Sequence, residues 1–294
     1  MVKHKGIVFG VVLAGVVVCA VLIYVASTFL ITGMTPFTKS VAIIEVKGVI
    51  AGSDEIIKKI KEYRENDNIA AVVLRINSPG GSAASSQEIH EELVTLAKEK
   101  VLVVSMGDVA ASGGYYIAVA ADYIFANPAT TTGSIGVIAE TLNMEEALGN
   151  LGIKGVVIKS GKFKDTFSPL RPMTEEERDF MQQYINNIFA QFVKAVAEGR
   201  KLPEAEVLKI ADGRVLTGEQ ALKLKLIDEL GNMEDAINTA AKKAGIEGKP
   251  NVIYPEKERP TLLSILLDEV KSGIAEEISG PAFKAEYLML PWRW

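Results

Sequence analysis

A serine at the junction of a predicted strand and a predicted helix is the first residue of this sequence with a clear chemical use. Val101 to Ser105 is an apolar, β-branched run typical of a buried strand, and Tyr115 to Ala121 predicts a helix of small residues. Ser112 lies between them, where free backbone N–H groups and the positive end of a helix dipole stabilise a developing negative charge. Ser112 is therefore a candidate nucleophile, although serine is also an ordinary N-cap residue.

The base that would activate this serine is not expected to be a histidine. The chain contains 2 histidines. His4 lies in a charged N-terminal tip, ahead of a hydrophobic segment that separates it from the rest of the chain. His90 lies beside the apolar stripe of a predicted helix, and no second histidine follows at the spacing of a zinc protease. A partly buried lysine is the remaining common base for serine.

A glycine-rich strand end could supply an oxyanion hole. Ser78-Pro79-Gly80-Gly81 ends a nearly all-apolar predicted strand. Glycine lets a backbone N–H approach a bound carbonyl closely, so Gly80 and Gly81 could provide half of the hole and the Gly113 N–H the other half. An ordinary strand-to-loop turn explains the same glycines. The oxyanion-hole interpretation is favoured, because a second predicted strand leads to a serine in the same way.

The candidate lysines form a basic cluster. Lys159, Lys162 and Lys164 lie together in one short stretch, with Phe163 and Phe167 available as apolar cover. Desolvation disfavours a charged ammonium, so such cover is what a lysine base needs. A solvated group of surface charges is the plain alternative, and composition does not choose among the three lysines.

Composition excludes several other classes of protein. The chain has 294 residues, of which 48% are hydrophobic, and a formal net charge of −5. The negative charge and the lack of a basic stripe argue against a nucleic-acid partner. The single cysteine, Cys19, allows no intramolecular disulfide and no thiolate metal site. Val18 before it is not a small residue, so a lipoprotein signal is set aside.

The N-terminal region predicts a membrane anchor. Gly6 to Ile31 contains no charged residue and exceeds the ~20 residues that span a bilayer. Lys3 and Lys5 precede it, so the positive-inside rule places the N-terminus in the cytoplasm and the rest of the protein outside. We therefore expect a single-pass protein of the cell membrane. Ala26-Ser27 resembles a cleavage site, so processing stays open.

From Val41 onward the sequence alternates predicted strands and helices, which indicates an α/β fold with a parallel sheet. The pattern predicts strands at 41–50, 69–76, 101–105, 123–126 and 153–160, and helices at 54–66, 85–99, 115–121 and 174–200. The last of these helices opens with a capping box at Thr174 and Glu177. Its stripe of Phe180, Tyr184, Ile188 and Phe192 indicates core or a subunit contact.

Five motifs in this order resemble the signal peptide peptidase A family in its short, single-repeat form. The motifs are LRINSPGG, AASGGYY, TTGSIGV, SGKFKD and ADGRVLTGEQA. That family consists of membrane-bound serine proteases, so the resemblance implies a Clp-protease/crotonase-like α/β fold, a repeated ββα superhelix, behind an N-terminal transmembrane helix. The resemblance spans Val41 to Gly231. It implies these roles: Ser112 as nucleophile, Lys164 as general base, Gly81 and Gly113 as oxyanion donors, and Ser134 as the residue that orients the lysine.

The resemblance also implies substrate and assembly. Hydrophobic peptides such as cleaved signal peptides would lie extended along two edges, formed by Gly80, Ser82, Ile135, Gly136 and Val137. No metal or organic cofactor is expected. The protein would be a ring-shaped homo-oligomer in which adjacent protomers contribute the serine and the lysine of one site. Two rivals remain: a stomatin-operon-type protease that cuts a specific hydrophobic partner, and a non-catalytic membrane scaffold.

The expected domain organisation follows from these assignments. Residues 1–5 form a cytoplasmic tip, 6–31 the transmembrane helix, 32–40 a linker and 41–258 the Ser-Lys peptidase domain. Residues 259–294 form an amphipathic helix and an apolar tail that ends in YLMLPWRW. So apolar a tail is expected to pack on a neighbouring subunit or on lipid.

Overall fold

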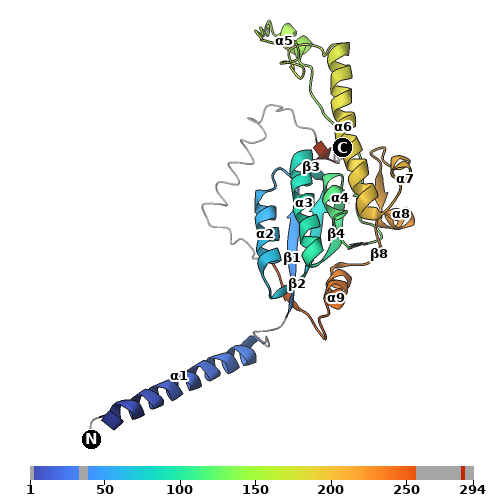
Figure 1. Cartoon of the computed structure of the whole chain (residues 1–294). Helices are drawn as coiled ribbons and strands as arrows, with labels where there is room; N and C mark the ends of the chain where they lie inside the picture. Colours follow the sequence, from blue (N-terminus) through green and yellow to red (C-terminus); the bar gives the residue numbers. More distant parts are fainter. Residues whose placement is uncertain (1–2, 33–38, 256–285, 289–294) are drawn as a thin grey trace.

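The structure, a computed structural model, describes residues 3–32, 39–255 and 286–288 (Figure 1). Side chains are described for residues 13–27 and 39–255. The amphipathic helix predicted after residue 259 lies outside the described residues, as does all of the predicted apolar tail except residues 286–288.

An eight-stranded sheet forms the centre of the described chain, in the order β7-β6-β4-β2-β1-β9, with β5 paired to β4 and β8 paired to β5. Its middle strands β1 (Ser40–Lys47), β2 (Ile69–Ser78) and β4 (Val101–Ala111) pair in parallel. Their nearly all-apolar sequences suit a sheet covered on both faces, so the predicted parallel α/β arrangement is confirmed. The shorter strands are β3 (Gly80–Ser82), β5 (Tyr123–Ala126), β6 (Thr131–Gly133), β7 (Val215–Thr217), β8 (Glu229–Leu230), β9 (Asn251–Ile253) and β10 (Glu286–Leu288).

Helices cover both faces of the sheet (Figure 1). Successive side chains of a strand point to opposite faces, so Val41 and Ile43 pack with α9 while Ala42 and Ile44 pack with α2 and α3. The helices are α1 (Lys3–Thr32), α2 (Asp54–Glu65), α3 (Ala83–Glu99), α4 (Gly113–Ala118), α5 (Glu145–Asn150), α6 (Glu175–Arg200), α7 (Glu204–Leu208), α8 (Gly218–Lys223) and α9 (Met233–Lys243).

The short helix α4 is held in the core from two sides. Tyr115 is fully buried, and its hydroxyl donates a hydrogen bond of 2.7 Å to the Leu226 carbonyl. α6 passes over the other end of α4 at Gly199, where a methyl group would lie 2.1 Å from the Val119 carbonyl oxygen. Only glycine permits this approach, so the position of α4 is set by close packing.

The long helix predicted at 174–200 is confirmed as α6, with Thr174 as its N-cap and a complete capping box to Glu177. Its aromatic stripe divides into two halves. Phe192 is fully buried in the core, whereas Phe180 is 49% exposed. Figure 1 shows why: the N-terminal half of α6 extends beyond the sheet and its covering helices.

Residues 138–174, which we call the arm, lie at the far end of α6 together with α5 (Figure 1). The prediction of a buried strand at residues 153–160 is wrong. This segment forms no strand, and Ile158 in it is 97% exposed. The apolar run resembles a strand, but no neighbouring strand or helix face in the described chain covers it. α5 likewise buries no residue.

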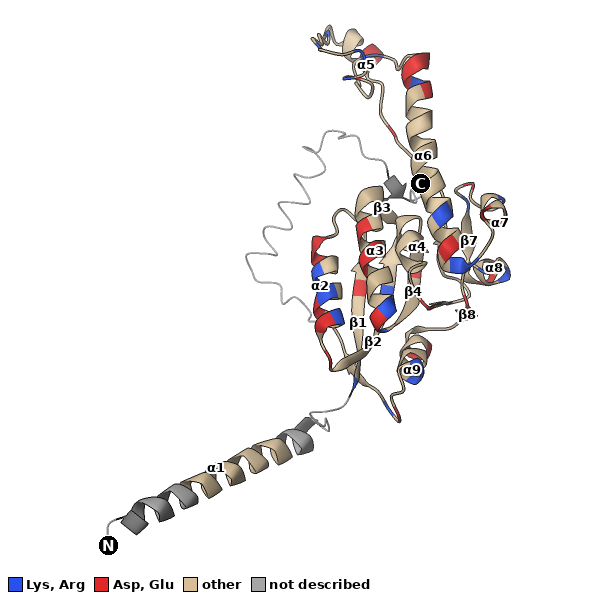
Figure 2. Cartoon of the chain, in the orientation of Figure 1, with Lys and Arg blue, Asp and Glu red and all other residues tan. Residues whose placement is uncertain are grey.

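α1 is a helix of 30 residues at the N-terminus. Large apolar side chains along it are exposed, for example Ile23 at 69%, and the described side chains of α1 are uncharged (Figure 2). Among the residues whose side chains are described, no helix has the length and hydropathy of a membrane span.

Replacing Tyr115 by phenylalanine tests how α4 is anchored. The change removes the only hydroxyl bound to the buried Leu226 carbonyl among the described residues, so we expect the free energy of unfolding to fall by about 1–2 kcal/mol. Tyr123→Phe is the control, because its hydroxyl contacts Glu229 at an exposed position. Its effect should stay below about 0.5 kcal/mol. Denaturant unfolding measures both, and equal losses would contradict the anchoring role.

Candidate active site

Ser112 occupies a strained turn between β4 and α4. Its backbone has φ 53° and ψ −118°, a region that L-residues rarely adopt, and its side chain is 1% exposed. The Ser112 N–H donates to the Gly133 carbonyl at 2.8 Å, which ties the turn to β6. Such a conformation costs about 1–3 kcal/mol and persists where the surroundings enforce it, most often at functional sites. A sharp strand-to-helix turn of this kind presents a nucleophile at the N-terminus of the helix.

The loop after β2 directs one backbone N–H, that of Gly81, toward the edge on which β3 pairs with β10. The Gly80 N–H donates to the Ser78 hydroxyl at 3.1 Å, and the Ser82 N–H donates to the Ile50 carbonyl at 2.8 Å. Gly81 lies between them with φ 156°, and a methyl group on it would lie 2.3 Å from the Ile50 oxygen. Position 81 must therefore be glycine, and its N–H faces the edge away from Ile50.

Close packing brings this loop next to the serine. A methyl group on Gly114 would lie 2.8 Å from the Ser78 carbonyl oxygen, and Ser78 pairs with Ala110 of β4. Gly113 is the first residue of α4, so its N–H has no partner one turn earlier in the helix. The structure thus brings together three of the predicted site residues, Ser112, Gly113 and Gly81.

Ser134 lies directly after β6, beside the nucleophile. It has φ 52° and is 8% exposed, and its N–H donates to the Arg214 carbonyl at 2.8 Å. The preceding residue, Gly133, is the one that accepts the Ser112 N–H. Ser134 therefore lies where it could contact a base that approaches Ser112.

The predicted substrate segment after Ser134 packs against the chain near Gly213. Ile135 is 1% exposed, and its carbonyl accepts the Gly213 N–H at 3.0 Å. A methyl group on Gly136 would lie 3.3 Å from the Gly213 Cα. Val137 packs partly against the core. Substrate binding by Ile135, Gly136 and Val137, and by Gly80 and Ser82, stays a prediction.

Lys164 lies on the arm, apart from this group. It borders an open hollow of about 450 Å³ whose lining residues all come from the arm and α6. Among the described residues its ammonium has no hydrogen-bond or ion-pair partner, and no hydrogen bond joins it to Ser112. The described chain thus holds the serine and the lysine on separate parts.

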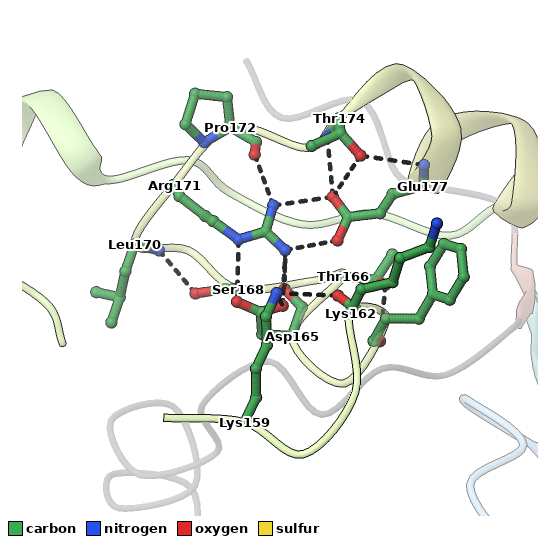
Figure 3. A network of polar contacts seen from close by, with 11 residues as sticks. Lys159, Lys162, Asp165, Thr166, Ser168, Leu170, Arg171, Pro172, Thr174 and Glu177 are labelled. Atoms are coloured by element: carbon green, nitrogen blue, oxygen red, sulfur yellow. Dashed lines mark hydrogen bonds and ion pairs between the residues drawn. The ribbon is translucent and has the colours of Figure 1, made fainter. Parts of the chain in front are cut away.

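The other two lysines of the cluster are engaged. Lys159 pairs with Asp165 (Figure 3), and Lys162 pairs with Glu176. Lys164 is therefore the lysine of the three without a carboxylate partner among the described residues.

Arg171 joins the arm to the start of α6 (Figure 3). Its guanidinium binds the Asp165 carboxylate at 2.7 and 3.0 Å and the Glu177 carboxylate at 2.5 and 2.8 Å. Hydrogen bonds from Arg171, then from Lys159, hold the pKa of Asp165 well below its usual range. Those from Arg171 lower the pKa of Glu177 to about 2. The sequence analysis missed Arg171, although the capping box indicated a carboxylate at this helix N-terminus.

His90 lies against the core rather than at the site. Its ring meets the edge of Tyr116 with 5.1 Å between the ring centres. Burial lowers the pKa of His90 to about 4, so the imidazole is neutral near pH 7.

Comparisons with known proteins give the family. A profile of peptidase family S49 matches residues 95–247, and a Clp protease profile matches residues 39–132. A putative protease of Synechocystis sp. is 44% identical over 214 residues, which is 72% of this chain and 77% of the relative. A putative protease of Methanocaldococcus jannaschii is 37% identical, over 76% of this chain and 73% of the relative. A putative signal peptide peptidase SppA of Enterococcus faecium is 36% identical, over 69% of this chain and 63% of the relative.

Glycine at position 112 should relieve the strained turn. We expect Ser112→Gly to be more stable than Ser112→Ala by about 1 kcal/mol, because glycine adopts positive φ without the cost of a Cβ but loses more chain entropy on folding. The free energies of unfolding of the two variants, measured in urea, give the difference. A Gly variant no more stable than the Ala variant would show that the turn carries no strain.

The half-buried His90 should make stability depend on pH. The folded protein keeps His90 neutral down to about pH 4, whereas the unfolded chain binds a proton near 6.5. Its contribution is therefore complete above pH 6.5 and is lost as pH falls toward 4. The urea midpoint should fall more between pH 7 and pH 5 in the wild type than in His90→Gln. Equal falls in the two proteins would show that His90 does not titrate in this way.

Proposed function

This chain belongs to peptidase family S49 and is a serine protease, and on that premise we propose that it is a membrane-anchored endopeptidase with a Ser-Lys dyad. Ser112 is the proposed nucleophile and Lys164 the proposed general base. The observation that carries the proposal is the strained Ser112 turn, with the backbone N–H groups of Gly81 and Gly113 beside it.

The proposed reaction is acyl transfer to serine. Neutral Lys164 accepts the Ser112 proton as Oγ attacks a peptide carbonyl, and the N–H groups of Gly81 and Gly113 donate to the oxyanion. The tetrahedral intermediate collapses, and the Lys164 ammonium gives its proton to the leaving amine. Water then attacks the acyl-enzyme by the same route and restores Ser112. Each oxyanion donor is worth about 3 kcal/mol in the transition state.

The state of the lysines supports Lys164 as the base. Lys159 and Lys162 are each paired with a carboxylate, which stabilises the charged form that a base must avoid. Lys164 has no such partner among the described residues. In the proposed site Ser134 accepts a hydrogen bond from Lys164 and orients it toward Ser112.

The distance between arm and serine supports a site shared by two protomers. Ser112 is buried in the body of the protein, and Lys164 is exposed on the arm. The arm also exposes apolar side chains that a neighbouring subunit would cover, for example Leu151 at 74% and Val156 at 83%. We therefore propose a ring-shaped homo-oligomer in which the arm of each protomer brings Lys164 to the Ser112 of the next.

The proposed location is the cell membrane, with the N-terminus in the cytoplasm and the catalytic domain outside. The uncharged sequence from Gly6 to Ile31 and the lysines before it support this topology. The exposed apolar side chains along α1 suit contact with lipid. An enzyme at this location meets hydrophobic peptides, such as cleaved signal peptides left in the membrane, and we propose these as its substrates. The name of the Enterococcus faecium relative, a putative signal peptide peptidase, agrees with this proposal.

Mixing two inactive variants tests the dyad and its sharing. We expect Ser112→Ala and Lys164→Ala each to lower hydrolysis of a hydrophobic peptide by at least about a thousandfold, because each removes one partner of the proton transfer. Co-expressed in equal amounts, the two chains should recover about one quarter of wild-type activity, since one neighbour pair in four unites an intact serine with an intact lysine. Lys162→Ala is the matched control and should retain activity.

The possible results separate the parts of the proposal. No recovery in a mixed ring would show that each protomer holds a whole site. Full activity in Lys164→Ala would reject this lysine as the base. Full activity in Ser112→Ala would reject the proposed nucleophile.

A further inference from the structure

The turn that carries Lys164 is attached to α6 on both sides of the lysine. On one side, the Phe163 ring stacks on Phe180 of α6, with 5.1 Å between the ring centres. On the other side, the Asp165 carboxylate binds the Arg171 guanidinium, which also binds a carboxylate in the first turn of α6. The lysine thus lies between an aromatic contact and an ion-pair contact to the same helix.

Two cations also hold the main chain of this turn. The Lys162 carbonyl, two residues before Lys164, accepts a hydrogen bond of 2.9 Å from the Lys159 ammonium. The Asp165 carbonyl, directly after the lysine, accepts one of 3.2 Å from the Arg171 guanidinium. The backbone from which the Lys164 side chain extends is therefore fixed by the same two cations that bind the Asp165 carboxylate.

The charges of this network cancel. Asp165 and Glu177 are negative, and Arg171 and Lys159 are positive. The side chains of the two carboxylates are only 11% and 5% exposed, so solvent screens them weakly. Their lowered pKa values keep both ionised near neutral pH. Arg171 is therefore the cation that compensates both shielded carboxylates at once.

Asp165 is also the charged group closest to Lys164 in the lining of its hollow. Among the described residues that line this hollow, it is the only titratable one besides the lysine, and α6 contributes the uncharged Phe180 and Met181. An uncompensated carboxylate there favours the charged ammonium, which cannot accept a proton. The other charged residues at this end of α6 are exposed to solvent: Glu175, Glu176, Arg178 and Asp179.

We infer that Arg171 is a positioning residue for the proposed base, because it fixes the turn of Lys164 on α6 and neutralises the carboxylates beside it. This inference rests on the proposed function. Arg171 acts through Lys164, whose place and charge both matter at the moment when Ser112 loses its proton. A guanidinium suits this task, because it stays charged and its rigid fork binds carboxylates bidentately.

Two opposite substitutions in the full-length protein test the charge balance through the pH profile of kcat/KM for a hydrophobic peptide. Arg171→Met leaves the carboxylates in excess, so the acid limb of the profile should move up by about one pH unit. Asp165→Asn leaves the cations in excess, so the limb should move down by a similar amount. The double variant loses one charge of each sign, and its limb should return to within about 0.3 pH unit of the wild type.

The kinetic constants test the positioning. Arg171→Lys keeps the charge but lacks the fork that joins two carboxylates, so we expect kcat to fall about tenfold with KM and the acid limb unchanged. Lys162→Met is the matched control, because it removes a cation two residues from Lys164 whose ion pair is exposed to solvent. Screening by water should keep its kcat and KM within about twofold of the wild type.

Lys164→Ala, assayed in parallel, separates this inference from the proposed function. Full activity in Lys164→Ala shows that the proposed function itself is wrong. If Lys164→Ala is inactive but the acid limb stays in place in Arg171→Met and Asp165→Asn, the charge role of Arg171 is overturned. A wild-type kcat in Arg171→Lys overturns the positioning role. If Arg171→Met does not fold, Asp165→Asn still decides, because loss of structure alone does not move the limb to lower pH.

Discussion

The close approach of α4 to the loop after β2 is the contact on which the candidate site depends. Gly114 lies so near the Ser78 carbonyl that any side chain there would strike it at 2.8 Å. This contact determines the position at which α4 begins. It therefore also determines the positions of Ser112 and of the Gly113 N–H relative to Gly81. The Ser112 turn is strained, and the strain persists because β6 holds the Ser112 N–H while the packed core holds α4. The proposed nucleophile and oxyanion donors are thereby held by the fold itself, which is the arrangement that electrostatic catalysis needs.

The arm has a different physical character. It contributes little to the core, and Ile158 in it is almost fully exposed. Its order comes from charges instead, because Arg171 joins the Asp165 carboxylate to the Glu177 carboxylate at the start of α6. Isolated surface ion pairs contribute about 0–1 kcal/mol, but Asp165 and Glu177 are largely shielded from solvent and each accepts two bonds from one guanidinium. The protein thus consists of a packed core and an arm held by ion pairs. This division suits the proposed site, which a second copy of the chain completes.

The sequence predicted the regular parts of this fold and missed the parts that depend on distant partners. The apolar strands and the Thr174 capping box have local signals, and both were found. The segment 153–160 carries the same apolar signal as a strand, yet strand formation needs a neighbour, and none is present in the described chain. The pairing of Tyr287 with Gly81 joins residues too far apart for any local pattern to indicate. For the site, the motif resemblance supplied the proposed residue roles and the expectation that serine and lysine come from different protomers. The structure adds that Lys164 lies on the arm, apart from Ser112.

The length of α6 has a consequence for how this protein tolerates change. Its 26 residues give a rod of about 39 Å, fixed in the core at Phe192 and free at Phe180. The length of this helix determines how far the arm extends from the core. Because each residue turns the helix by about 100°, the length also determines the direction in which the arm points. An insertion of one residue between these two aromatics would swing the arm to another side of the molecule. Seven residues would restore its facing but lengthen its reach by about 10 Å. In the proposed ring, the length of α6 therefore sets the spacing between subunits, and insertions and deletions are better accommodated elsewhere in the chain.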